Sequence, residues 1–481
     1  MSMPSSPPLS SVPSGPLTIG ERLDRLPLSR RHFVIAGIVG VGILFDFYEV
    51  FLAGTLSTVL EEDFEVTGTS LKLILASAFI GMFFGAICFG RIADKVGRRR
   101  AFFLTLSTYS LFSVLAAFSP NLETLVLLRF LAGIGIGAEL PICDAYLADL
   151  MPARVRGKMV AFAYTVGFLG TPLCGFLATG IATDTILGID GWRWMFVFGA
   201  AGAVICWLLR FALPESPRWL ERMGRHDEAD AVVRSMESAS GLEPLARERQ
   251  APTPVAQQER DGLSLSRLTV LVNPTYRRRT VMIWVFQVLQ PLGYYGFGSL
   301  VPLVLAAKGY DVVNSLQFSA VTFLGYPLGS ALSIPIMERL ERKTILVGSA
   351  GLMAVFGLLF GNAATTWQIL VLGFAYTAVS NVFSNGYHAY QGELYPTAIR
   401  ASGAGIAYSL GRLANAAMPF ILVPVLDAAG VNAMFGVVAA AMVVLCVNVG
   451  VFGPRTTGLS VDRAALDTEL DRAASEQLTP R

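Results

Sequence analysis

The sequence GRIADKVGRRR, residues 90–100, decides the fold. It holds one acid and five cations, and long apolar segments lie on both sides of it. Each such charge would cost about 2.5–3.5 kcal/mol at the centre of a bilayer. We therefore expect a tight polar turn between two membrane-spanning helices, with Gly90 and Gly97 allowing the turn to pack closely against neighbouring backbone.

The composition of the whole chain agrees with a membrane protein. Of its 481 residues, 53% are hydrophobic and only 15% are charged, whereas a soluble domain carries about 25% charged residues. The net charge of +2 gives no indication of a nucleic-acid partner, because the cations lie in short loops between apolar runs. The five cysteines lie in apolar runs without metal-ligand spacing, so we expect no metal and no cofactor.

A transmembrane helix needs about 20 predominantly apolar residues. The chain offers twelve such segments, at roughly 33–60, 70–90, 101–118, 122–148, 158–182, 192–213, 279–306, 315–338, 344–361, 366–391, 400–426 and 429–452. This predicts an all-α membrane protein, divided into an N-terminal tail (1–30), a six-helix bundle (31–213), a polar linker (214–278), a second six-helix bundle (279–453) and a C-terminal tail (454–481). The first residues lack the pattern of a cleaved signal peptide, so we expect the first helix to be retained.

The distribution of Lys and Arg predicts the orientation. Sixteen of these residues lie in the N-terminal tail and short loops on one side, and three lie in the loops of the other side. Positive residues are enriched in cytoplasmic loops. We therefore expect both termini to be cytoplasmic.

The two halves are related by a shift of 244 residues without gaps. Gly81 and Gly85 then align with Gly325 and Gly329. Asp149 and Arg156 align with Glu393 and Arg400, and Tyr164 aligns with Tyr408. One offset that serves three separate regions predicts two pseudo-symmetric bundles. Transporters built from such repeats bind substrate near the bilayer midplane, between the halves.

Five motifs resemble those of the major facilitator superfamily over residues 25–455. They are GRIADKVGRRR at 90–100, RFLAGIGIG at 129–137, DLMPARVRG at 149–157, PESPRWL at 214–220 and ELYPTAIR at 393–400. The last two are similar to the branch of sugar porters, organic-ion transporters and synaptic-vesicle-type proteins. Residues 22–33 and 294–311 resemble bacterial metabolite–proton symporters, including nicotinate transporters, and the second segment departs from the sugar-porter pattern of the seventh helix.

The resemblance implies a charge cluster at the cytoplasmic ends of the helices. Its members are Asp94, Arg98, Asp149 and Arg156 in the first half, with Glu338, Arg342, Glu393 and Arg400 in the second. In the family such charges pair when the transporter faces outward and separate when it opens inward. The simpler alternative is that they only set the topology.

Ionisable residues within spans are candidates for function. In the first half these are Asp46, Glu49, Arg129, Glu139 and Asp144, which we group as candidate proton-coupling residues. A carboxylate buried away from water gains a proton more readily, so Asp46 or Glu49 is a candidate proton carrier. Either acid is also a candidate counter-charge for a cationic substrate. Arg129 matches the intramembrane arginine of the family, and it pairs with one of these acids or only with backbone carbonyls.

The second half offers candidates for substrate binding. Arg412 suits an anionic group, because its guanidinium can bond a carboxylate through two N–H groups; the alternative is pairing with an acid such as Glu393. His388 can bond a substrate carboxylate or take up a proton. The other polar and aromatic candidates are Asn415, Gln287, Gln290, Tyr294, Tyr295, Asn381, Asn385, Tyr48 and Tyr164.

Together these residues predict a secondary transporter that takes up a small organic acid, of the nicotinate type, with a proton. Its partners would be substrate, proton and bilayer, and the resemblance implies a monomer in a bacterial inner membrane. The alternatives are an organic cation or sugar carrier of the same fold, or a non-transporting receptor on a transporter fold. An enzyme is not expected, because the chain has no phosphate-binding motif and no nucleophile–base pair.

Overall fold

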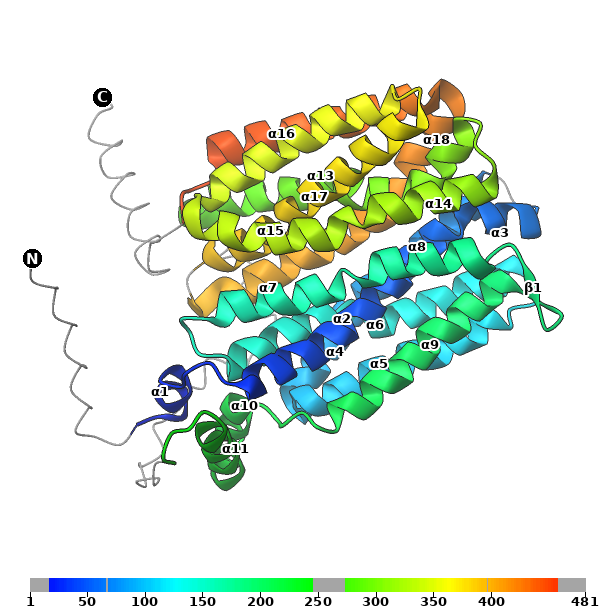
Figure 1. Cartoon of the computed structure of the whole chain (residues 1–481). Helices are drawn as coiled ribbons and strands as arrows, with labels where there is room; N and C mark the ends of the chain where they lie inside the picture. The colour runs from blue at the N-terminus through cyan, green and yellow to red at the C-terminus, as the bar shows by residue number, and fades with distance from the viewer. Residues whose placement is uncertain (1–16, 66–67, 245–272, 396, 457–481) are drawn as a thin grey trace, which may run out of the picture.

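The computed structural model describes residues 17–65, 68–244, 273–395 and 397–456. Two helical bundles lie side by side, with the first half of the chain in one and the second half in the other (Figure 1). The first bundle comprises α2 (Arg30–Thr55), α3 (Ser57–Asp63), α4 (Thr69–Val96), α5 (Arg98–Ala117), α6 (Leu122–Leu150), α7 (Arg156–Gly167), α8 (Gly170–Ile181) and α9 (Gly191–Arg210). A two-stranded hairpin, β1 (Thr185–Ile186) with β2 (Ile189–Asp190), joins α8 to α9.

The second bundle ends in a helix that contains two spans. It comprises α13 (Pro274–Ala307), α14 (Val312–Phe323), α15 (Gly325–Arg339), α16 (Arg342–Gly361), α17 (Thr366–Glu393) and α18 (Thr397–Phe452). Among the described residues, eleven helical segments are long and apolar enough to cross a membrane. The last, Gly403–Phe452, runs for 50 residues and is interrupted at Gly430, whose φ of +77° is not helical. It therefore supplies two spans, and the predicted twelve-helix fold is confirmed.

Glycines bring the helices of each bundle into backbone contact. Without a hydrophobic force between helices in lipid, small residues that permit close approach stabilise their association. A Cβ added at Gly81 or Gly85 of α4 would collide with backbone carbonyls of α6. These carbonyls belong to Phe130 and Ile134. In the second bundle, Gly325 and Gly329 face the carbonyls of Phe374 and Ala378. Each of the four positions in the first bundle lies 244 residues before its counterpart in the second, so the predicted repeat holds in three dimensions.

The turn at 90–100 is tighter than the sequence suggested. α4 continues to Val96 and α5 begins at Arg98, so that Gly97 alone separates them. Its φ of +101° is unfavourable for any residue with a side chain. Glu215, from the PESPRWL motif, accepts hydrogen bonds from the backbone N–H groups of Arg98 and Arg99 at 3.0 and 3.2 Å. This carboxylate caps the otherwise unpaired start of α5.

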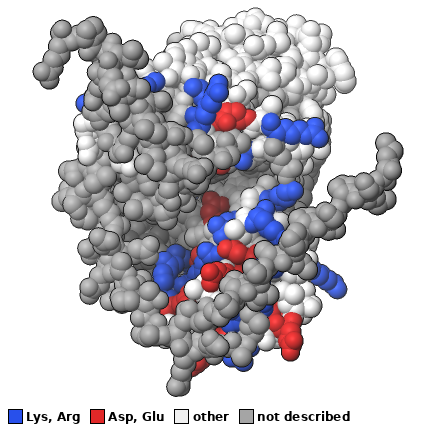
Figure 2. All heavy atoms as spheres, turned by 90° about the vertical axis from the view of Figure 1, so that its left-hand side faces the viewer, with Lys and Arg blue, Asp and Glu red and all other residues white. Residues whose placement is uncertain are grey.

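Three short helices cover the end of the first bundle at which this turn lies, here called the charged end. They are α1 (Ile19–Asp24), α10 (Pro217–Arg222) and α11 (His226–Ala239). Figure 2 shows Lys and Arg gathered with Asp and Glu on this face. The predicted linker thus begins with two helices; its residues 245–272, like most of the predicted tails, lie outside the described ranges.

Arg22 of α1 holds α11 in place. The buried Arg22 guanidinium donates to Asp230 at 2.5 Å and to Glu237 at 2.7 Å. Burial raises the pKa of Asp230, but the hydrogen bonds from Arg22 and Arg234 outweigh it, and the pKa ends below its usual 3.8. Arg25 adds a second bond to Glu237 at 2.7 Å. Arg22, with Arg25 beside it, therefore ties the N-terminal helix to the linker.

Substitution of Gly133 tests the close contact of α4 and α6. In Gly133→Ala the new Cβ would meet the backbone of Ala78, including its carbonyl carbon at 2.9 Å. We expect a loss of about 1–3 kcal/mol of stability, because backbone cannot move aside as a side chain can. Thermal unfolding of the purified protein in detergent measures this. Gly348→Ala is the matched control, since nothing lies within 4 Å of that position; an equal loss in both variants would contradict the interpretation.

Removal of the Arg22 charge tests the contact of α1 with α11. In Arg22→Gln we expect faster amide hydrogen exchange along α11, while Arg222→Gln, at an exposed position, leaves exchange unchanged. Because the pKa of Asp230 lies below 3.8, its contribution is complete above that pH and is lost only as the pH falls further. Protection of α11, corrected for intrinsic exchange rates, should therefore be the same at pH 5 and pH 7.

Candidate functional site

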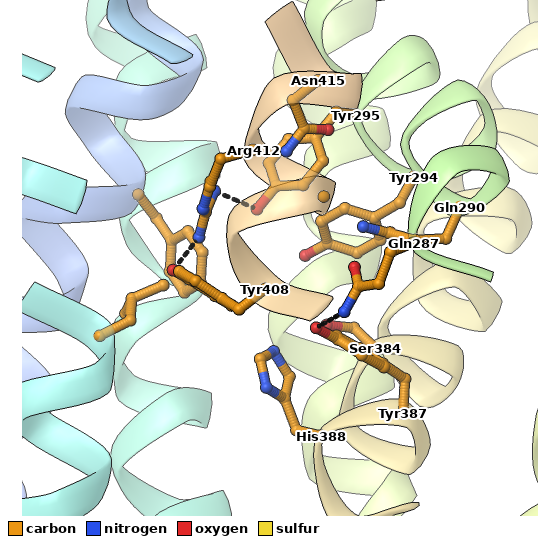
Figure 3. Close-up of a pocket in the computed structure, with 13 residues that line it drawn as sticks. Gln287, Gln290, Tyr294, Tyr295, Ser384, Tyr387, His388, Tyr408, Arg412 and Asn415 are labelled. Atoms are coloured by element: carbon orange, nitrogen blue, oxygen red, sulfur yellow. Dashed lines mark hydrogen bonds between the residues drawn. The ribbon is translucent and has the colours of Figure 1, made fainter. Parts of the chain in front are cut away.

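A small cavity lies between the two bundles (Figure 3). Its lining residues are Phe47, Leu140, Gln287, Gln290, Tyr294, Tyr295, Ser384, Tyr387, His388, Tyr408, Gly411, Arg412 and Asn415. The first bundle contributes the two apolar members, and the second bundle contributes all of the polar ones. Its volume is about 30 Å³, which suffices for a water but for no organic substrate. The surrounding side chains or helices must therefore rearrange before an organic substrate can fill this site.

Arg412 is the charged residue of this cavity. It is 4% exposed, and its guanidinium donates to the hydroxyl of Tyr295 at 3.2 Å and to the hydroxyl of Tyr408. The guanidinium also lies 4.5 Å from the centre of the Tyr408 ring, one helical turn away. Among the described residues no carboxylate lies within ion-pair distance of Arg412.

The alternative pairing of Arg412 with Glu393 is not observed. Glu393 accepts a hydrogen bond from the Thr456 hydroxyl at 2.6 Å and lies 3.6 Å from Arg342. Both contacts lie at helix ends of the second bundle, on the same side of the protein as the charged end of the first. Arg412 is therefore a buried cation whose described contacts are neutral, which makes it a ready partner for an anion.

Some of the predicted polar residues around Arg412 line the cavity, and others lie behind it. Gln287 lines the cavity, with its amide N–H groups donating to Tyr387 at 2.8 Å and to Gln391 at 2.9 Å. Asn415 also lines it, and its buried side-chain oxygen has no hydrogen-bond partner within the described ranges. Gln290, Tyr294 and Tyr295 complete the predicted residues that reach the cavity.

Asn381 and Asn385 lie behind the cavity rather than on its surface. The Asn381 amide donates to the backbone of Tyr326 at 2.5 Å and its oxygen accepts from Tyr294 at 3.0 Å. Asn385 donates to the hydroxyls of Ser330 and Ser333. These amides position α15 and its neighbours, and sequence reasoning could not separate this role from substrate contact.

His388 connects the cavity to the first bundle. Its ring centre lies 5.6 Å from that of Tyr164, and the Tyr164 hydroxyl donates to Asp144 at 3.2 Å. The other oxygen of Asp144 is buried and has no hydrogen-bond partner in the described part of the chain. Asp144 and His388, which the repeat places at equivalent positions, are thus linked through one tyrosine across the bundle interface.

The first bundle contains a buried ion pair that the sequence did not reveal. Glu139 of α6 pairs with Arg210 at the end of α9, and both side chains are fully buried. Thr105 donates a further hydrogen bond to Glu139 at 2.6 Å. Arg210, the last residue of α9, was not among the predicted site residues.

Asp46, Glu49 and Arg129 are also buried in the first bundle. Arg129 donates to the backbone carbonyl of Glu49 at 3.4 Å and lies 5.6 Å from the Phe196 ring. Asp46 is 1% exposed, and neither of its carboxylate oxygens has a hydrogen-bond partner among the described residues. Tyr48 is turned away from the cavity, because its hydroxyl donates to the Met195 carbonyl at 2.8 Å.

Aromatic rings close the cavity on the side away from the charged end. Tyr295 lies 6.1 Å from Phe51 and 5.4 Å from Phe79, and Tyr326 lies 5.6 Å from Phe51. A Cβ at Gly54 would come within 2.6 Å of the Ser299 backbone, so α2 and α13 are also in close contact there. At the level of His388 a hydrogen bond of 3.0 Å joins Thr165 to Ser330.

The predicted charge cluster is described only in part. Asp149 accepts a hydrogen bond from Ser216 at 2.7 Å, Arg98 meets Glu215 through its backbone, and Arg342 lies near Glu393. Arg156 is the first residue of α7. The side chains of Asp94, Glu338 and Arg400 lie outside the described part of the chain. Its role as a latch between conformations stays a prediction.

The buried pair of Glu139 and Arg210 gives a stability test. Glu139→Gln and Arg210→Gln should each destabilise the protein by about 3–5 kcal/mol, because each leaves the other residue's charge buried without a counter-ion. The double variant should lose less than the sum of the two. Thermal unfolding in detergent measures the three changes. Glu228→Gln, which removes an exposed pair with Arg225, should cost no more than about 1 kcal/mol.

Comparisons with known proteins agree with this architecture. The sequence model of the family described as "Sugar (and other) transporter" matches residues 29–466. The putative metabolite transport protein YyaJ of Bacillus subtilis is 34% identical over 397 residues, which cover 82% of this chain and 86% of YyaJ. The niacin transporter NiaP of Acinetobacter baylyi is 29% identical over 450 residues, covering 92% of this chain and 99% of NiaP.

A solved structure shares the fold. The xylose transporter XylE of E. coli, in a partially occluded inward-open conformation, superposes with a TM-score of 0.72 over 89% of this chain and 99% of XylE, at 21% sequence identity. The family match, the metabolite-transporter relatives and the two-bundle architecture lead to one assignment. This chain belongs to the sugar (and other) transporter family of the major facilitator superfamily and is a multi-span membrane transporter, not an enzyme.

Proposed function

We propose that this protein takes up a small aromatic carboxylate of the nicotinate type together with a proton. The observation that carries the proposal is Arg412, a buried cation in the central cavity whose described contacts are tyrosine hydroxyls and rings. An anion that enters the cavity would replace these neutral contacts with a charge-assisted pair. Tyr295, Tyr387 and Tyr408 offer faces for an aromatic ring.

Asp46 is the proposed proton carrier. Glu139 has Arg210 as its counter-ion, Asp144 accepts a hydrogen bond from Tyr164, and Arg129 donates to the backbone carbonyl of Glu49. Both carboxylate oxygens of Asp46 are buried without a hydrogen-bond partner among the described residues, whereas this holds for one oxygen of Glu49. An ionised carboxylate in that position would be costly, so binding and release of a proton there can change the balance between conformations.

The names of two relatives support this substrate class. NiaP of Acinetobacter baylyi is named a niacin transporter, and a putative niacin/nicotinamide transporter of Bacillus subtilis is 27% identical over 82% of this chain. The family name and the xylose transporter keep a sugar as the second candidate. The amides of Gln290 and Asn415 at the cavity would suit sugar hydroxyls.

We also propose an orientation, a membrane and an oligomeric state for the protein. The excess of Lys and Arg on one side supports cytoplasmic termini. Relatives named as inner membrane metabolite transport proteins of E. coli support a bacterial inner membrane. We further propose that the monomer is the transporting unit, because the cavity is lined by residues of one chain.

Uptake into proteoliposomes tests the proposal. We expect radiolabelled nicotinate or benzoate to accumulate when an inward proton gradient is imposed, and to equilibrate without one. Arg412→Ala should abolish binding and uptake, whereas Arg412→Lys should keep the charge and lose most of the affinity. Asp46→Asn should lose gradient-driven accumulation but keep exchange of internal for external substrate. Asp184→Asn, at an exposed acid of the hairpin region, is the matched control.

Competition separates the alternatives. Excess xylose or an organic cation should leave nicotinate uptake unchanged. If xylose is taken up instead, with Arg412→Ala still active, the anion site is wrong and the sugar alternative holds. If Asp46→Asn still accumulates substrate under the gradient, another acid carries the proton.

A further inference from the structure

A second hollow lies on the outer side of the second bundle, away from the central cavity. Its volume is about 430 Å³, and its lining residues are Val281, Trp284, Val285, Val288, Leu289, Leu410 and Val444. They come from α13 and from both spans of α18. Val281, Val288 and Val444 are 45–52% exposed, so this groove opens to the surface that a membrane-spanning bundle presents to lipid.

Trp284 makes the groove more than an apolar hollow. Its indole N–H is buried and has no hydrogen-bond partner among the described residues. A tryptophan N–H buried in an apolar setting normally finds an acceptor, and every other lining side chain is aliphatic. The groove therefore lacks one hydrogen-bond acceptor that a ligand could supply.

Arginines lie on the same helix faces, toward the charged end. Arg277, Val281, Trp284 and Val288 follow each other at spacings of four, three and four residues, and so form one face of α13. Arg278, Val285 and Leu289 form the adjacent face. Trp284 lies seven residues from Arg277, which is about 10 Å along a helix.

The start of α13 has an excess of positive charge. Arg277, Arg278 and Arg279 follow one another, and no acid lies in the first turn, where the helix dipole already favours an anion. Arg279 is buried and donates to the Leu394 carbonyl, and Arg278 donates to the Val451 carbonyl at 2.8 Å. Arg277 is exposed, so its guanidinium is free to turn toward a ligand at this end of the groove.

We propose that this groove binds one anionic phospholipid from the leaflet at the charged end. An acyl chain fills the valine- and leucine-lined hollow, an ester carbonyl accepts the Trp284 N–H, and Arg277, with Arg278 beside it, holds the phosphate. Clusters of basic residues next to spans attract anionic headgroups, and tryptophan is enriched at the depth where headgroup and chain meet. The arginines fit the phosphate, the apolar lining fits an acyl chain, and the unpaired N–H fits an ester carbonyl of the same phospholipid.

The groove adjoins the candidate substrate site through the two helices that separate them. Leu289 and Leu410 line the groove, and the next residues, Gln290 and Gly411, line the central cavity. A lipid in the groove would thus contact the outer side of the segments that carry the polar lining. The proposal does not depend on the identity of the substrate.

Native mass spectrometry of the full chain, titrated with phosphatidylglycerol or with phosphatidylethanolamine, tests the site. We expect one phosphatidylglycerol to bind more tightly than the zwitterionic lipid. Arg277→Gln should weaken phosphatidylglycerol binding about fivefold, the effect of one basic residue near a membrane surface, and should leave phosphatidylethanolamine binding unchanged. Arg100→Gln, an exposed arginine of the first bundle, is the matched control.

Quenching by lipid with brominated acyl chains gives an independent measurement. Brominated phosphatidylglycerol should quench Trp284 at lower concentration than the other tryptophans, and this first phase should be absent in Trp284→Phe. Trp367→Phe, which removes a 73% exposed tryptophan, should retain it. Equal affinity for the two headgroups, equal effects of Arg277→Gln and Arg100→Gln, or an unchanged quenching curve in Trp284→Phe would each overturn the proposal.

Discussion

Close contact of helix backbones at glycine is the constraint on which this structure depends. Lipid gives helices no hydrophobic reason to associate, so packing must come from shape. Gly85 against Ile134 in the first bundle, and Gly329 against Ala378 in the second, bring α4 to α6 and α15 to α17 with no side chain between them. Helices joined in this way cannot slide past each other easily. Each bundle is therefore suited to move as one unit, with the cavity at the boundary between them.

Buried charge is distributed unequally over these two units. The first bundle holds the pair of Glu139 with Arg210, and Arg129 beside Glu49. The second bundle holds Arg412 among tyrosines. The buried acids proposed to take up a proton and the buried cation proposed to bind an anion thus lie in different bundles. This separation gives the proposed coupling a physical basis, because movement of the bundles changes the distance between the two kinds of site.

Sequence reasoning predicted the fold well because the determining signals are local or repeated. Apolar length defines spans, and the offset of 244 residues that aligned Gly81 with Gly325 also relates their carbonyl partners. The site was predicted less completely. Arg412, His388 and Gln287 reach the cavity, but the pairing of Glu139 with Arg210 depends on which faces of α6 and α9 meet. The turn predicted over residues 90–100 was too long, because the sequence does not distinguish charges at helix ends from charges in a loop.

The position of Arg412 has a consequence for the electrical behaviour of the transporter. A membrane potential of 100 mV acts on one elementary charge with about 2.3 kcal/mol across the full membrane. A bound carboxylate would cancel the charge of Arg412, so the loaded site would respond weakly to voltage. In the empty carrier, Asp46 without its proton would carry one negative charge against the positive charge of Arg412. Neither state would then hold a net charge in the field, so the membrane potential would act weakly on the whole cycle and the pH gradient would drive uptake.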